Sequence, residues 1–162
     1  MIKIKRNTNG DTRVATKVPT MSDFIDANYE HGKNVGDVMS EIANRVRIAG
    51  SNHDWTKFTE PYTSMFYRDL CNTISGNMKF EDGEWAKEHY SRERHHLNRH
   101  VPDDVNLIDV LEMIADCICA GMARSGSVRP IKIDNDVLQK AVKNTADMIE
   151  SWIELVEIEE EE

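Results

Sequence analysis

All six histidines of the 162-residue chain lie between positions 31 and 100. One of them stands directly beside an aspartate in the stretch NHDWTK, which holds His53, Asp54 and Lys57. Imidazole is the commonest metal ligand in proteins, and carboxylates complete sites for harder ions such as manganese, iron or magnesium. These residue types therefore indicate either a metal centre or histidines that only pack and form hydrogen bonds. Their positions on the expected helices decide between the two.

The other histidines fall on stretches with helical periodicity. His31 lies four residues before Val35 on the apolar stripe of its stretch, where a core histidine bonded to the backbone is the alternative to a ligand. His89 and His96 lie seven residues apart, so an ideal helix places them on one face. His95 lies about 100° round from His96, and both reach one site only if the helix bends or ends there.

Asp116 is the carboxylate that most needs a partner. It stands in the apolar stretch LEMIADCICAG, where burial of an unpaired charge is costly. Protonation, a buried Arg or Lys, or a metal ion would neutralise it. Asp109 and Glu112 precede it by seven and four residues, so a polar line runs along one face of an otherwise apolar helix.

Periodicity and capping signals predict the elements that position these residues. Thr20 is a candidate N-cap with Asp23 at capping-box spacing, Pro61 suits a first helical turn, and Gly76 suits a stop. Helices are expected over five stretches: residues 20–50, 59–76, 84–100, 105–124 and 135–158. Residues 1–19 favour an extended arm or a short hairpin. The predicted fold class is all-α with a short extended N-terminal segment.

The length fits one helical domain over residues 20–158, between a basic N-terminal segment, residues 1–19, and an acidic tail, residues 159–162. The net charge of −9 disfavours duplex nucleic acid as a partner. No apolar leader opens the chain, and its most apolar run, residues 110–123, is too short to span a bilayer. A cytoplasmic protein without a membrane partner is expected.

Three cysteines, Cys71, Cys117 and Cys119, form no CxxC pair. We expect them to be reduced and mostly buried packing residues, with a thiolate zinc site as the alternative.

The candidate ligands follow one order along the chain: His31, His53–Asp54, His89, His95–His96 and Asp116. This order resembles that of the HD superfamily of metal-dependent phosphohydrolases. HDWTK is similar to its His-Asp-x-x-Lys element, and the later histidines resemble the extra ligands of its two-metal members. The chain also resembles a group of short phage and bacterial HD-like proteins, whose HD.SKF, W..H, HH and EM..D elements appear here as HDWTKF, EWAKEH, RHH and EMIAD. The resemblance covers about residues 21 to 124.

The resemblance implies an HD-domain-like helical bundle that holds one or two divalent ions. The first ion would be held by His31, His53, Asp54 and Asp116. Asp54 would bridge to a second ion held by His89 and His96, with His95 as a further ligand. Manganese, iron, magnesium, zinc, cobalt and nickel are the metals that fit such ligands.

The activity implied by the resemblance is hydrolysis of a nucleotide or another small phosphate ester by a metal-activated water. Asp54 would be catalytic as a ligand, and Lys57 would hold a phosphate oxygen as a point charge. Arg92 and Arg99 could do the same, and two solvated arginines are the alternative. The compartment would be the cytoplasm, which is the host cytoplasm if a phage encodes the protein.

Two other functions remain open from the sequence. The chain could be a non-catalytic interaction or nucleotide-capture protein on an HD-like scaffold, with a host protein as its partner. It could also be a helical bundle with incidental histidines. The full first ligand set and Lys57 favour an enzyme, whereas the basic N-terminal segment and acidic tail favour an interaction protein. The apolar face of the last expected helix could form a homodimer or close the monomer core.

Overall fold

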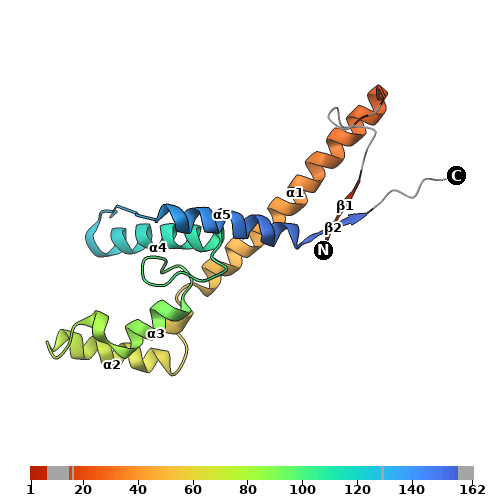
Figure 1. The fold of residues 1–162 in the computed structure, drawn as a ribbon. Helices are drawn as coiled ribbons and strands as arrows, with labels where there is room; N and C mark the ends of the chain where they lie inside the picture. Colours follow the sequence, from red (N-terminus) through yellow and green to blue (C-terminus); the bar gives the residue numbers. More distant parts are fainter. Residues whose placement is uncertain (7–14, 16, 129, 157–162) are drawn as a thin grey trace. The chain divides into compact units, whose positions relative to one another are not determined.

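The computed structural model describes residues 1–6, 15, 17–128 and 130–156, and these are mostly helical, with two short strands (Figure 1). The predicted all-α class with a short extended segment at its beginning is confirmed. The acidic tail at residues 159–162 and most of the predicted arm, residues 7–14 and 16, lie outside the described residues. The chain divides into two compact units. Unit 1 comprises Met1–Arg45 with Ala146–Glu162, and unit 2 comprises Val46–Thr145.

Unit 1 combines most of helix α1 (Met21–Asn52) with two parallel strands, β1 (Ile2–Lys5) and β2 (Ile153–Val156). The predicted capping box is present, because Thr20 N donates to Asp23 Oδ2 and Asp23 N donates to Thr20 Oγ1. No described residue of α1 is fully buried.

The predicted helix over residues 135–158 is wrong at its end. Helix α5 (Asn135–Glu150) stops, and β2 follows it as an extended segment. The change is explained by pairing with β1, in which Ile2 lies opposite Ile153 and Ile4 opposite Leu155. Tertiary context of this kind overrides the helical pattern of the local sequence.

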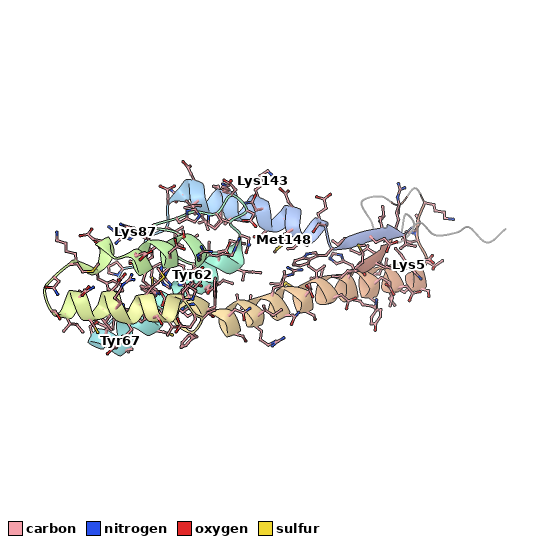
Figure 2. The ribbon with its side chains drawn as sticks, turned by 90° about the horizontal axis from the view of Figure 1, so that it is seen from below. Lys5, Tyr62, Tyr67, Lys87, Lys143 and Met148 are labelled. Carbon is pink, nitrogen blue, oxygen red and sulfur yellow. The ribbon has the colours of Figure 1, made fainter. Side chains whose placement is uncertain are left out.

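Unit 2 holds helices α2 (Tyr62–Ile74), α3 (Glu84–Arg92) and α4 (Leu107–Ser125), the first part of α5, and two 3₁₀ turns, η1 (Trp55–Lys57) and η2 (Phe80–Asp82). Helices α2 and α3 pack side by side (Figures 1 and 2). The apolar core of unit 2 joins α4, α5 and the chain between α3 and α4. It consists of Leu97, Val105, Val110, Met113 and Ala141.

Helix α3 is shorter than its polar sequence predicts. It ends at Arg92, and Glu93 is extended with φ −88° and ψ 115°. The expected single helical face that carries both His89 and His96 is therefore wrong. The helix ends because Glu93 turns inward and is only 4% exposed. Its carboxylate accepts hydrogen bonds from the backbone N and the side-chain Oγ1 of Thr56, in η1.

A buried carboxylate positions the beginning of α3. Asp69 of α2 accepts a hydrogen bond from Trp85 N at 2.8 Å and forms an ion pair with Arg68 at 3.0 Å. Gly83 lies so close that a Cβ atom there would stand 2.7 Å from Asp69 Oδ2. Trp85 in turn stacks on His89, with ring centroids 4.3 Å apart. The beginning of α3 therefore helps to position His89, a candidate metal ligand.

The three cysteines are free, as predicted, but Cys71 and Cys119 are exposed and Cys117 is half-buried, so the expectation that they are mostly buried is wrong. The described helices include none with the length and apolarity needed to cross a bilayer.

Candidate metal centre

The sharp turn after α1 positions the His-Asp pair. Asp54 has φ 57° and ψ 32°, in the left-handed region that aspartate tolerates better than most residues. Its backbone carbonyl accepts from Lys57 N, and its Oδ2 atom accepts from Lys57 Nζ. Burial raises the pKa of Asp54, but the hydrogen bond and the charge of Lys57 lower it by more. The pKa therefore lies below its usual value, and the carboxyl is ionised.

The two oxygens of Asp54 face different partners. Oδ2 lies 3.3 Å from His53 Nε2 and also accepts from Lys57. Oδ1 lies 3.4 Å from His89 Nε2 and 3.6 Å from His95 Nε2, and it is fully buried without a hydrogen bond. An orphaned carboxylate oxygen is costly unless a cation or proton lies beside it.

A buried hydroxyl fixes the tautomer of His89. Thr56 Oγ1 donates its single proton to Glu93 Oε1 at 2.7 Å, so it can only accept from His89 Nδ1, which lies 2.6 Å away. Burial and the neighbouring His96 lower the pKa of His89 to about 3, and the ring is neutral. Its Nε2 atom therefore carries a lone pair directed at Asp54 and His96.

His95 and His96 follow the end of α3 and complete this side of the cluster. His96 Nε2 lies 2.7 Å from His89 Nε2, and burial together with His95 lowers the pKa of His96 to about 4. His95 is 1% exposed, yet neither ring nitrogen has a hydrogen-bond partner. Its Nδ1 atom lies 3.1 Å from Glu112 Oε1, but not along the direction that a hydrogen bond requires.

Helix α4 supplies two carboxylates on the other side of His53. Glu112 Oε1 accepts from His53 Nδ1 at 2.9 Å, so in the neutral ring His53 Nε2 carries a lone pair. Asp116 Oδ1 lies 3.5 Å from the same Nε2 atom. The predicted polar line on α4 thus meets the His-Asp turn, although Asp116 is half-buried and not enclosed as its apolar neighbours suggested.

Three overlapping groups of side chains can each surround one ion, with all their ligand atoms within 4.8 Å of one another. They are Asp54 with His89, His95 and His96; His53 with Asp54 and Asp116; and His53 with His95 and Glu112. Asp54 belongs to two of these groups through different oxygens. Imidazoles and carboxylates arranged in this way are suited to one divalent ion or two, such as manganese, iron or zinc.

The structure brings together all but one of the ligands expected from the sequence. His31 lies exposed on α1, about six helical turns before the end of that helix, and it belongs to none of the three groups. It is not on a buried stripe, because Val35 is 48% exposed.

The two arginines expected near a phosphate are occupied elsewhere. Arg92 pairs with Glu88 at 2.7 Å and lies over the Tyr62 ring. Arg99 pairs with Glu81 at 2.7 Å and lies over the Tyr90 ring. Both are exposed, so neither is directed at the cluster by a described contact.

Sequence reasoning missed the residues that hold the ligands. Thr56 and Glu93 orient His89, and Glu112 orients His53. Arg94 forms a bidentate ion pair with buried Asp109, at 2.8 and 2.9 Å, directly before His95. Only Glu112 had a signal in the sequence, as a carboxylate one helical turn before Asp116, whereas the other contacts join segments far apart in the chain.

A small groove runs along α4 beside Asp116. It has a volume of about 160 Å³ and is lined by Asp116, Cys117, Ala120, Gly121, Arg124 and Ser125. Arg124 places a positive charge two helical turns beyond Asp116.

Comparison with known proteins finds no match among curated proteins and none among solved structures. Residues 20–157 match the model of a protein family described as a family of unknown function, DUF5662. Because this match covers most of the chain, including every residue of the cluster, the protein belongs to the DUF5662 family.

Proposed function

We propose that the protein is a metal-dependent phosphohydrolase of the HD type that acts on a nucleotide or another small phosphate ester. The observation that carries the proposal is Asp54, whose two oxygens face two different groups of ligands while Oδ1 is buried without a hydrogen bond. A carboxylate in this position is suited to bridging two cations.

The donor set fits divalent metal ions because it presents lone pairs where hydrogen-bond donors would otherwise stand. His53 and His89 use their Nδ1 protons on Glu112 and Thr56, so their Nε2 lone pairs face Asp54 and its neighbours. Acceptors facing acceptors repel one another unless a proton or cation lies between them. A purely structural cluster would be expected to alternate donors and acceptors.

The chain's own residues can serve the reaction in three ways. When bound, divalent ions would activate a water and offset charge on the phosphoryl oxygens. Lys57 holds Asp54 through one of its three N–H donors and keeps two for a phosphate oxygen. Arg124, in the groove beside Asp116, could bind a more distant anionic part of the substrate. Arg124 would thus take the role of anion binding that was expected of Arg92 and Arg99.

An interaction or nucleotide-capture protein on the same scaffold is the second candidate. The observation that favours it is unit 1, whose long helix exposes apolar side chains that no described residue covers. Such a surface is typical of a binding protein, and the metal would then have a structural role.

The test is metal content combined with a hydrolysis screen. The purified protein is loaded with manganese or iron, desalted and examined by elemental analysis beside His53→Ala and the control His100→Ala, whose histidine is exposed and outside the cluster. We expect about one or two ions per chain in the parent and the control, and a clear loss in His53→Ala.

The same three proteins are then screened for phosphate release from nucleotides and small phosphate esters. Hydrolysis by the parent and the control but not by His53→Ala supports the proposal. Metal binding without hydrolysis of any ester favours the interaction protein, and a parent that retains no metal contradicts both metal readings.

A further inference from the structure

The described part of unit 1 contains no fully buried side chain. All the fully buried side chains among the described residues, apolar and polar, lie between Asp54 and Ala141 in unit 2. Isolated helices and two-stranded sheets are marginal in water unless they pack against something. A second contact surface is therefore expected for unit 1.

Helix α1 carries a regular stripe of uncharged and mostly apolar residues at spacings of four and three. The stripe consists of Met21, Ile25, Asn28, Gly32, Val35, Met39 and Ile42. Met21 is 73% exposed, and Ile25 and Met39 are each 56% exposed. A repeat of 3.5 residues is the seam of two helices that pack along their length. All six charged residues between Met21 and Ile42 lie on the opposite half of an ideal helix.

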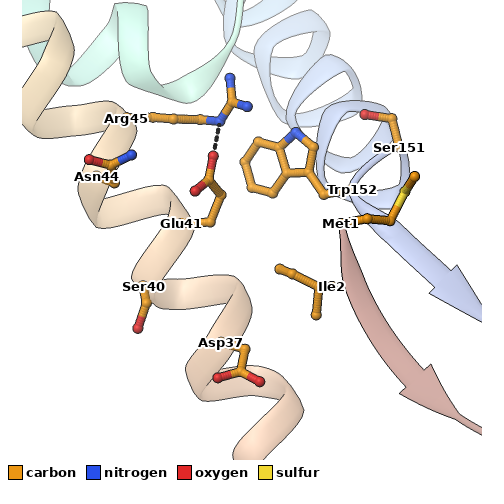
Figure 3. A pocket seen from close by; sticks show the side chains of 9 residues that line it. All are labelled: Met1, Ile2, Asp37, Ser40, Glu41, Asn44, Arg45, Ser151 and Trp152. Atoms are coloured by element: carbon orange, nitrogen blue, oxygen red, sulfur yellow. Dashed lines mark hydrogen bonds and ion pairs between the residues drawn. The ribbon is translucent and has the colours of Figure 1, made fainter.

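The strands of unit 1 leave this stripe uncovered. A cavity of about 540 Å³ lies between α1 and the strand region, and its helix side is formed by Asp37, Ser40, Glu41, Asn44 and Arg45 (Figure 3). Arg45 lies 4.3 Å from the Trp152 ring centroid on that side. These positions belong to the polar face, so the protein's own strand region faces the polar half of α1 and the apolar stripe points elsewhere.

No contact among the described residues explains two glycines on or beside the stripe. A Cβ atom at Gly32, on the stripe, or at Gly36, beside it, would meet nothing within 4 Å. Glycine inside a helix is less favourable than alanine, and no described residue requires its small size here. A second helix crossing the stripe would require it, because glycine lets two helix backbones approach closely.

We propose that the α1 stripe packs against the same stripe of a second copy of this chain, as a two-fold symmetric helix pair. A copy of the stripe has the same length, the same 3.5-residue period and the same absence of charge, so it is self-complementary. This proposal does not depend on the proposed hydrolase function.

The area is sufficient for a stable dimer. Six apolar side chains on or beside the stripe are 42–73% exposed: Met21, Phe24, Ile25, Tyr29, Val35 and Met39. Burying a fully exposed side chain of this size removes on the order of 100 Å² of apolar surface, and on average a little over half of each of these is exposed. Two copies would thus bury about 700 Å² of apolar surface and, since interfaces are about 60% apolar, roughly 1,200 Å² in total, the lower limit for stable interfaces.

The test is the mass of the full chain in solution, measured by sedimentation over a range of concentrations with a reductant present for exposed Cys71 and Cys119. We expect a dimer of the 18.6 kDa chain. Val35→Glu, which places a charge in the seam, should be a monomer, whereas the matched control Lys33→Glu on the opposite face should remain a dimer. A monomeric parent, or equal masses for the two variants, would overturn the proposal.

Gly32→Ala keeps the test valid if Val35→Glu fails to fold. Alanine favours the helix, so unfolding cannot explain a weaker dimer. We expect the dimer dissociation constant to rise at least about tenfold, with unchanged helical content by circular dichroism. A dissociation constant equal to that of the parent would contradict packing of a second helix at Gly32.

Discussion

Both units expose large apolar side chains, but they differ in what they bury. The described part of unit 2 buries seven polar or charged side chains, among them Asp54, His89 and His95. The described part of unit 1 buries none and exposes large apolar side chains along one face of α1. Both arrangements are costly for an isolated chain. Our two proposals give each arrangement a partner that the single chain lacks: cations for unit 2 and a second copy of the chain for unit 1.

The largest effect is expected from removing the charge shared by both ligand groups. Asp54→Asn keeps the shape and tolerates the left-handed backbone, but it removes a carboxylate that would bridge two ions. We expect loss of bound metal, a fall in any hydrolysis rate by about a thousandfold or more, and unchanged helical content. Elemental analysis and circular dichroism measure this.

Asp103→Asn is the control for that variant, because Asp103 is an exposed aspartate outside the cluster. Metal content in Asp54→Asn equal to that of the control would remove Asp54 from the ligand set, and with it the account of what unit 2 buries.

A smaller effect should follow from loosening a ligand without removing it. Thr56→Val deletes the hydroxyl that accepts from His89 Nδ1, so the ring is free to change tautomer. Loss of a contact that orients a ligand typically lowers metal affinity by about 10- to 100-fold, which competition with a chelator would measure. Thr56→Ser should restore the affinity, and Thr59→Val, at an exposed threonine, should leave it unchanged. Equal affinities in Thr56→Val and the parent would show that His89 needs no such support.

Features that depend on neighbouring residues could be predicted from the sequence, whereas features that depend on contacts between distant segments could not. The beginning of α1 and the two ends of α2 followed from Thr20, Asp23, Pro61 and Gly76, which act within a few residues of the helix ends. The end of α3 could not be predicted, because Glu93 pairs with Thr56, 37 residues away. Strand β2 was also missed, because its partner is at the other end of the chain.

The candidate site shows the same division. The adjacent His53 and Asp54, and the neighbouring His95 and His96, stand out in the sequence, and the structure places all four in one cluster. His31 was expected on a buried stripe and entered the ligand set through the resemblance to the HD superfamily, but that stripe is exposed. Helical period alone therefore identified an apolar face without showing whether the interior of this chain or another surface covers it.

An effect on stability is expected at the loop that carries His95. Arg94→Ala leaves the buried Asp109 without its bidentate partner. Because Arg94 is itself 40% exposed, we expect a loss of about 1–3 kcal/mol in the free energy of unfolding, measured by urea denaturation. Arg92→Ala removes an exposed pair with Glu88 and should cost less than about 0.5 kcal/mol. Similar costs for the two variants would show that the Arg94–Asp109 pair does not anchor the loop.

The smallest effects separate the two units by one substitution made in each. Gly83→Ala in unit 2 sets a Cβ atom 2.7 Å from Asp69 Oδ2, so the bond from Asp69 to Trp85 N must shift at a cost of about 1–2 kcal/mol. Gly32→Ala in unit 1 meets nothing within 4 Å and should stabilise the dissociated chain by up to about 1 kcal/mol. Urea denaturation at protein concentrations below the dissociation constant of the dimer would measure both changes. Destabilisation by Gly32→Ala under these conditions would mean that α1 is already packed within the single chain, and unit 1 would then need no second copy.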